Sequence, residues 1–220
     1  MTLEVYWGSG SPFAWRVLLT LEVKRLPYVS HLLEFSKQEH KAPEFLKLNP
    51  RGKVPVLRDG GFVVYESLAV MKYLDDKYPE TPLFGRSPEE AARINMSICE
   101  CTSYIETPVV DIVRPIFFDS VDDKREAIRA AGESLRGEFA ILNVHLSNNR
   151  PWLMGANISA ADIALYPLLA ILLRAMGKEV ADSLALRLTP LADHFPALAQ
   201  WMRSVESLPG YNNTYPPHWH

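Results

Sequence analysis

Three short motifs in the first third of the chain carry side chains suited to binding a small polar molecule. The first spans residues 8–13, where Ser9 and Ser11 directly precede a helical pattern. Unpaired N–H groups and the positive end of a helix dipole favour an anion there, and a thiolate held at such a point has a lowered thiol pKa. Ser11 is therefore placed to donate a hydrogen bond to a bound sulfur. The simpler alternative is that Ser9 or Ser11 only caps the helix.

The second motif is the run NPRGKVPVL at residues 49–57. A proline inside an apolar, strand-like run lacks the N–H that a sheet ladder uses, and a cis Val54–Pro55 bond is one explanation. A cis bond would turn the backbone of Val54 outward, toward an extended, peptide-like ligand. The alternative is an ordinary trans proline in an edge strand.

The third motif is the pair Glu66 and Ser67, at a second junction between a strand and a helix. Ser67 and the N–H groups around it are suited to a carboxylate, and Glu66 is suited to an ammonium group. Together they match the zwitterionic end of an amino acid. The alternative is an N-cap with an acidic neighbour.

Short predicted strands and helices, which follow one another along the chain, position these motifs. Polar–apolar alternation and β-rich composition predict strands, a period near 3.6 predicts helices, and Asp59-Gly60-Gly61 indicates a hairpin turn. The predicted order is β-α-β-α-β-β-α, with elements at residues 2–7, 13–24, 28–33, 36–48, 54–58, 62–65 and 68–78.

The residue pattern of the sequence changes after residue 79. The next stretch is rich in proline and lacks periodicity, which is typical of a linker. Beyond it the patterns are helical, at 89–117, 122–147, 159–176, 179–188 and 196–206, and the tail shows no helical pattern. We therefore predict an α+β fold with an N-terminal domain over 1–79, a linker over 80–88 and an all-helical domain over 89–220.

Composition excludes several classes of protein. Hydrophobic residues make up 48% and charged residues 22%, as in ordinary globular chains, and the net charge of -3 argues against nucleic acid as a partner. No apolar run is long enough for a membrane helix, and the N-terminus does not resemble a signal peptide. Cys99 and Cys101 are too few for a disulfide framework, which favours the cytoplasm. His218 and His220 without a third ligand make a poor metal site, so no metal is expected.

Taken together, SPFAWRV, NPRGKVPVL and ESLAVMKYLDDKYP resemble the glutathione-binding domain of the cytosolic glutathione transferases. The SPF opening followed by RV is most similar to the serine-dependent tau and zeta classes. The resemblance implies a thioredoxin-like domain followed by an all-α bundle, glutathione as co-substrate, a homodimer and a role in detoxification.

The resemblance also implies residue roles. Ser11 matches the catalytic serine, Val54 with cis-Pro55 would hold the cysteinyl backbone, and Glu66 and Ser67 would bind the γ-glutamyl end. The remaining glutathione-binding candidates are Phe13, Lys41 and Lys53, with His40 as a neighbouring substitute for Lys41. For Lys41 and His40 a solvated surface position is an equal alternative.

The helical domain contributes two further expectations. Ser159 to Asp162 has the form of a capping box, which makes Asp162 structural and not a general base. Tyr104, Ile105 and Pro108 are candidates for lining a second-substrate pocket for a hydrophobic electrophile, although such a stripe also suits a core.

The predicted activity is attack of the glutathione thiolate on an electrophilic carbon, in conjugation, dehalogenation or isomerisation. One alternative is a thiol oxidoreductase, which needs a cysteine where this chain has Ser11 and Pro12. Another is a non-catalytic scaffold that keeps the fold, because fold does not fix function.

Overall fold

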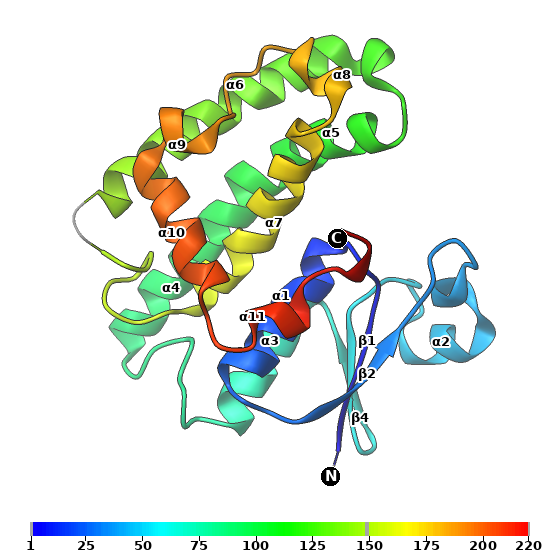
Figure 1. Cartoon of the computed structure of the whole chain (residues 1–220). Helices are drawn as coiled ribbons and strands as arrows, with labels where there is room; N and C mark the ends of the chain where they lie inside the picture. Colours follow the sequence, from blue (N-terminus) through cyan, green and yellow to red (C-terminus); the bar gives the residue numbers. More distant parts are fainter. Residues whose placement is uncertain (1, 148–149, 220) are drawn as a thin grey trace. The chain divides into compact units, whose positions relative to one another are not determined.

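The computed structural model describes residues 2–147 and 150–219, which form two compact units (Figure 1). The N-terminal unit combines Met1–Phe84 with the tail Leu208–His220, and the helical unit is Gly85–Ser207. The division differs from the expected boundaries at the tail, which packs with the first unit although it follows the helices in sequence.

The N-terminal unit is built on a mixed four-stranded sheet with strand order β2-β1-β3-β4. β1 pairs in parallel with β2, and the β1–β3 and β3–β4 pairs are antiparallel. Gly60 and Gly61 form the turn between β3 and β4, where Gly60 has a φ of 61°. The strands are β1 (Leu3–Trp7), β2 (Tyr28–Leu32), β3 (Val56–Asp59) and β4 (Phe62–Tyr65).

Helices cover both faces of this sheet. α1 and α3 pack on one face and α2 lies on the other (Figure 1). Leu3, Val5 and Trp7 alternate onto the α1/α3 face, where they meet the apolar sides of both helices, while Tyr6 points the opposite way and contacts Phe45 of α2. The helical elements are α1 (Pro12–Val23), η1 (Glu39–Lys41), α2 (Pro43–Leu48) and α3 (Ser67–Lys77). The predicted β-α-β-α-β-β-α order is confirmed.

The helical unit is organised around α7, which is apolar on nearly every side and correspondingly buried. α7 contacts α4, α5 and α10, and α6 packs along α5 and α10 (Figure 1). Its elements are α4 (Pro88–Glu100), the π-helical η2 (Cys101–Glu106), α5 (Thr107–Phe117), α6 (Val121–Leu146), α7 (Ala160–Met176), α8 (Glu179–Asp182), α9 (Leu191–His194) and α10 (Pro196–Glu206). The helix expected over 89–117 is thus continuous in its course, with a π-helical segment in its middle. The expected helix over 179–188 is only the single turn α8.

The predicted capping box at the start of α7 is present. The N–H and O–H of Ser159 both donate to Oδ2 of Asp162, each at 2.9 Å. Oδ1 of Asp162 accepts from the N–H of Leu153 and the indole N–H of Trp201, both at 2.8 Å. Asp162 is fully buried. Its carboxylate is therefore committed to holding three segments of the helical unit together.

The first residues of the expected linker are fixed to the N-terminal unit. Asp75 of α3 accepts hydrogen bonds from the backbone N–H groups of Leu83 and Phe84 at 2.7 and 3.1 Å. Its Oδ1 also pairs with the buried ammonium of Lys24 at 2.8 Å, and that ammonium binds the carbonyl oxygen of Thr81. The sequence pattern did not reveal this anchoring, because it depends on a buried ion pair between α1 and α3.

The tail contains two short helical turns that the sequence pattern did not predict, α11 (Tyr211–Thr214) and the 3-10 turn η3 (Pro217–Trp219). α11 packs on α1. Single turns of this kind are too short to be stable alone, so contacts with α1 must hold them. His220 lies outside the described residues, and the poor metal site expected for His218 and His220 therefore stays a prediction.

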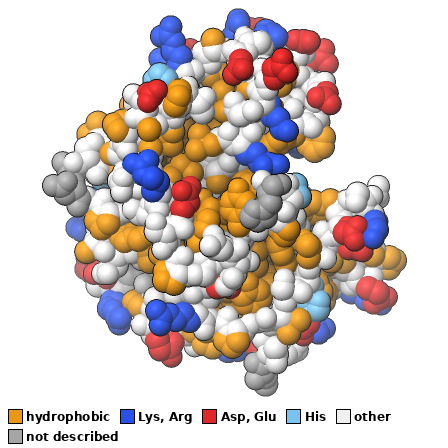
Figure 2. Space-filling view, in the orientation of Figure 1, with side chains coloured by type: hydrophobic (Ala, Val, Ile, Leu, Met, Phe, Trp, Pro, Cys, Tyr) orange, Lys and Arg blue, Asp and Glu red, His pale blue; other side chains and the backbone are white. Residues whose placement is uncertain are grey.

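Side chains of both charge signs are mixed over the described surface in Figure 2. There Lys and Arg lie among acidic and apolar side chains without merging into one basic area. Over the described ranges, no helix combines the length and apolarity required to cross a membrane. Among the same residues, no group of three or more His, Cys, Asp or Glu side chains is placed to hold a metal ion.

Candidate functional site

The strand register brings the three sequence motifs to one end of the sheet. Val56 pairs with Tyr6 on one side and with Tyr65 on the other. The loop that leads to Ser11 leaves β1 one residue after Tyr6, at Trp7. Pro55 precedes Val56 and Glu66 follows Tyr65, so each lies one residue outside the same pair. Segments that are far apart in the sequence thus meet at a single edge.

Ser11 is the N-cap residue of α1, with an extended backbone. Its Oγ accepts a hydrogen bond from the N–H of Ala14 at 3.3 Å, and its own N–H donates to the carbonyl of Gly8 at 3.1 Å. Ser11 therefore does cap α1, as the simpler alternative predicted. This capping does not compete with a role toward a ligand, because capping uses a lone pair of the hydroxyl, whose hydrogen is a separate donor.

Arg16 is a candidate site residue that the sequence analysis did not single out. It is only 1% exposed, and its Nη1 donates to Oγ of Ser67 at 3.4 Å. Its guanidinium also lies over the ring of Phe13, 5.0 Å from the ring centroid. The buried Arg16 side chain thus links α1 to the first residue of α3. The available signal was an arginine isolated in the otherwise apolar run of α1, since charged residues are rarely buried unless they have a partner.

Glu66 and Ser67 open α3 in contrasting environments. Ser67 is buried, whereas Glu66 is exposed. Glu66 has a φ of 70° and a ψ of 112°, a conformation that costs a residue with a side chain about 1–3 kcal/mol. Such strain persists where the surroundings impose it and is frequent at ligand sites.

The loop before β3 is held by side chains on both sides. The Val54–Pro55 peptide bond is cis, as one of the two alternatives predicted. The buried amide of Asn49 donates to the carbonyl of Lys53 at 2.7 Å and accepts from the N–H of Arg51 at 3.0 Å. Asn49 was not among the sequence candidates.

Lys41 lies against the same loop. Its ammonium donates to the carbonyl oxygens of Gly52 and Arg51, at 2.9 and 3.4 Å. A side chain on Gly52 would meet Lys41, and Gly52 has a φ of 57°. Lys53, the residue after Gly52, is exposed. His40 packs edge-on against Phe35, with ring centroids 5.1 Å apart.

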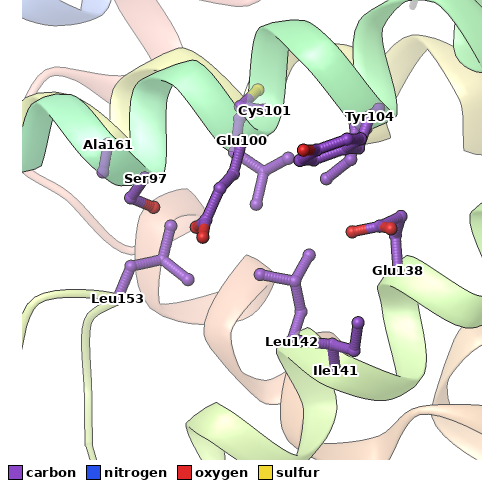
Figure 3. A pocket seen from close by; sticks show the side chains of 11 residues that line it. Ser97, Glu100, Cys101, Tyr104, Glu138, Ile141, Leu142, Leu153 and Ala161 are labelled. Atoms are coloured by element: carbon purple, nitrogen blue, oxygen red, sulfur yellow. The ribbon is translucent and has the colours of Figure 1, made fainter.

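The second-substrate candidates lie in the helical unit. Tyr104 and Ile105, both on η2, line a cavity of about 190 Å³ between the α4–η2 segment and α6. Figure 3 shows Glu100 and Glu138 directing their carboxylates into this space, with Leu142 and Leu153 among its apolar lining. Pro108 follows on α5 and is half-buried. Cys101 lines the cavity and is buried, whereas Cys99 is exposed, and both are free thiols.

Comparisons with known proteins agree with this architecture. The sequence model described as "Glutathione S-transferase, N-terminal domain" matches residues 10–77, and that described as "Glutathione S-transferase, C-terminal domain" matches residues 125–204. Glutathione S-transferase F9 of Arabidopsis thaliana is 33% identical over 81% of this chain and 84% of its own length. Glutathione S-transferase 1 of Dianthus caryophyllus is 30% identical over 82% of this chain and 81% of its own length.

A solved structure extends the similarity to the whole fold. The crystal structure of a glutathione S-transferase from the Antarctic clam Laternula elliptica matches with a TM-score of 0.83 and 32% identity, over 100% of this chain and 94% of that one. Curated relatives with different designations match at similar identity, including Glutathione S-transferase Z2 of Arabidopsis thaliana at 28%, so the comparisons do not single out a serine-type class. The thioredoxin-like sheet domain, the helical domain and these similarities together lead to one conclusion: the chain belongs to the glutathione S-transferase family and is a glutathione transferase.

Proposed function

We propose that this transferase activates the glutathione thiol through Ser11, for attack on a hydrophobic electrophile. The supporting observation is the position of Ser11 at the N-terminus of α1, on the sheet edge where the other two motifs also lie. There the Ser11 hydroxyl and the helix end would both stabilise a sulfur anion. Lowering the thiol pKa from about 8.5 by about two units makes thiolate a major species at neutral pH.

The rest of the tripeptide is assigned to the neighbouring groups. In this proposal the backbone of Val54, ahead of Pro55, pairs with the cysteinyl residue of glutathione as an added strand would. Glu66 receives the γ-glutamyl ammonium, and Ser67 with the N-terminus of α3 receives the adjacent carboxylate. Lys41 and Lys53 are the candidates for the glycine carboxylate, and Phe13 lines the site.

Arg16 contributes to this assignment through Ser67. Its guanidinium is buried among α1 and α3 and donates a hydrogen bond to the hydroxyl oxygen of Ser67. In this proposal that hydrogen bond orients Ser67 toward the γ-glutamyl carboxylate.

The test is a comparison of Ser11→Ala with wild-type protein. The pKa of the bound glutathione thiol is measured from its thiolate absorbance as a function of pH, alongside kcat/KM for a panel of aryl halides and epoxides. Loss of a charge-assisted hydrogen bond should lower kcat/KM roughly ten- to hundredfold and move the bound thiol pKa toward about 8.5. Glutathione affinity should change little, and Ser11→Thr, which keeps a hydroxyl, should retain part of the activity.

The outcomes separate the alternatives. An unchanged thiol pKa in Ser11→Ala would refute the assignment of Ser11. Failure of the wild-type protein to bind immobilised glutathione would favour a non-catalytic scaffold. Activity in thiol–disulfide exchange that exceeds conjugation would favour the oxidoreductase alternative, although Ser11 and Pro12 stand where that chemistry needs a cysteine.

We further propose a cytoplasmic homodimer. Glutathione transferases are typically dimeric, and the cavity at Tyr104 and Ile105 has exposed apolar side chains in its lining, which suits either a second copy of the chain or an electrophile. These exposed lining residues are Tyr104 and Ile141. Sedimentation equilibrium tests the homodimer, since a monomer mass at micromolar concentration would exclude it. The variant Tyr104→Ala tests the electrophile site. Only such a site predicts a raised KM for the electrophile with an unchanged KM for glutathione.

A further inference from the structure

The tail reaches the loop that carries Ser11. A hydrogen bond joins Nδ1 of His218 to Oγ of Ser9, at 2.5 Å, across 209 positions of sequence. Next to it, a Cβ built on Gly10 would lie 2.8 Å from Cε1 of His218 and 3.4 Å from Nε1 of Trp219. The imidazole therefore lies directly over the backbone that leads into α1.

The tail is fastened to α1 itself. The indole N–H of Trp15 donates to Oγ1 of Thr214 at 2.8 Å, and Thr214 is 1% exposed. The ring of Trp15 meets Tyr215 and Trp219 edge-on, with centroids 5.9 and 5.4 Å apart. Farther along α1, Glu22 accepts a hydrogen bond from Asn213 at 3.0 Å. The helix that begins at Ser11 thus also holds the segment that delivers His218.

The loop needs such a contact for a physical reason. Ser9 lies between Gly8 and Gly10, and Gly10 has a φ of 80°. Glycine leaves the backbone many conformations, whereas aiming a hydroxyl at a sulfur requires one of them to be held closely. Within the loop, the bond from the Ser11 N–H to Gly8 and the 3.3 Å cap to Ala14 are local. The bond to His218 ties the centre of the glycine-flanked stretch to a distant, packed segment.

We infer that His218 is a positioning residue for glutathione activation: by holding Ser9, it fixes the 8–11 backbone so that the Ser11 hydroxyl faces the bound thiol. This inference rests on the proposed role of Ser11. It assigns the tail a function in the chemistry, although the tail follows the helical unit in sequence. It also gives Ser9 a role distinct from that of Ser11, as the point at which the tail holds the loop.

The test is a double-mutant cycle on Ser9→Ala and His218→Phe, with both single variants and the pair. His218→Phe keeps an aromatic ring beside Trp219 and removes the hydrogen bond. His218→Asn is the conservative variant, because its amide can still bond to Ser9. His194→Phe is the matched control, since His194 is an exposed histidine of the helical unit. Each protein is characterised by thermal unfolding, the pKa of the bound glutathione thiol, and kcat and KM.

Each single variant should lower kcat/KM roughly three- to tenfold and raise the pKa of the bound thiol. The KM for glutathione and the unfolding temperature should stay near wild type. The double variant should be no worse than either single one, because both remove the same bond. His218→Asn should recover most of the loss, and His194→Phe should match wild type.

Three results would overturn the inference. The first is an unchanged thiol pKa in the single variants, and the second is a set of losses that multiply in the double variant. The third is a loss that follows the unfolding temperature, which would mean that the tail only supports the fold. Ser11→Ala is titrated in the same series. If it raises the thiol pKa while the Ser9 and His218 variants do not, only the positioning role fails, whereas an unchanged pKa in Ser11→Ala refutes the underlying proposal itself.

Discussion

Glu66 illustrates at the level of one residue how a proposed ligand site can oppose stability. It is exposed and has a φ of 70°, so its strain is not offset by burial of its own side chain. Glycine, which has no Cβ, adopts a positive φ at a lower steric cost. The presence of glutamate there is consistent with a requirement for its carboxylate, which we propose binds the glutathione ammonium.

Replacing Glu66 should therefore separate the two properties. Glu66→Gly should increase the free energy of unfolding by about 1 kcal/mol, because relief of strain exceeds the entropic cost of a glycine. Glu66→Ala keeps the Cβ and the strain, so its stability should remain near wild type. Both variants should bind glutathione more weakly by calorimetry. Equal stability of the two variants in urea unfolding would contradict the strain argument.

At the level of elements, the start of α7 depends on one carboxylate. Asp162 accepts four hydrogen bonds within the helical unit, from Ser159, Leu153 and Trp201. An amide in its place presents an NH₂ group to donors. Because these groups are buried, water is not available to satisfy them.

Asp162→Asn should accordingly lower the free energy of unfolding by about 3 kcal/mol or more, since at least two buried donors lose their acceptor. Ser159→Ala, which removes only one hydroxyl of the same capping box, should cost about 1 kcal/mol. Urea unfolding measures both. The protein that remains folded should keep its kcat, and a specific loss of kcat in Asp162→Asn would instead indicate a catalytic role.

Some elements have a local sequence signal and were predictable, and others do not. The hairpin around Gly60 and Gly61, the register-setting alternation of β1 and the capping box of α7 follow from local chemistry, and the structure confirms them. α11 and η3 carry no periodic signal, because each is about one turn long and is held by Trp15. The hydrogen bonds from Leu83 and Phe84 to Asp75 likewise depend on a partner in another element, α3.

At the scale of the whole molecule, the free energy of unfolding should depend on pH through Glu4, which lies on the central strand β1. Oε1 of Glu4 accepts from Nε and Nη2 of Arg58, and Oε2 lies 2.9 Å from Nε2 of His31. The hydrogen bonds from Arg58 first, and from His31 second, hold the pKa of Glu4 below its ordinary value. The folded protein therefore releases this proton more readily than the unfolded chain does.

The sign of the pH effect follows from that direction. A depressed carboxyl pKa contributes stability above the unfolded value of about 4.3, and this contribution is lost as pH falls through the folded value. Glu4→Gln should be less stable than wild type at pH 7, and the gap should close as the pH falls below about 4. Urea unfolding across this range measures it. A gap that stays constant with pH would assign the effect to packing alone.

The sequence by itself determined the order of the elements and the three motifs with Ser11, Val54–Pro55 and Glu66–Ser67, because strand alternation, helix starts and turn glycines are local properties. Only the tertiary structure decided which side chains support them. Register places Pro55 and Glu66 beside one pair of residues, burial gives Arg16 a partner in Ser67, and the returning tail sets His218 on Ser9. These are contacts between segments distant in sequence, and no local pattern encodes them, since each exists only after the chain has packed.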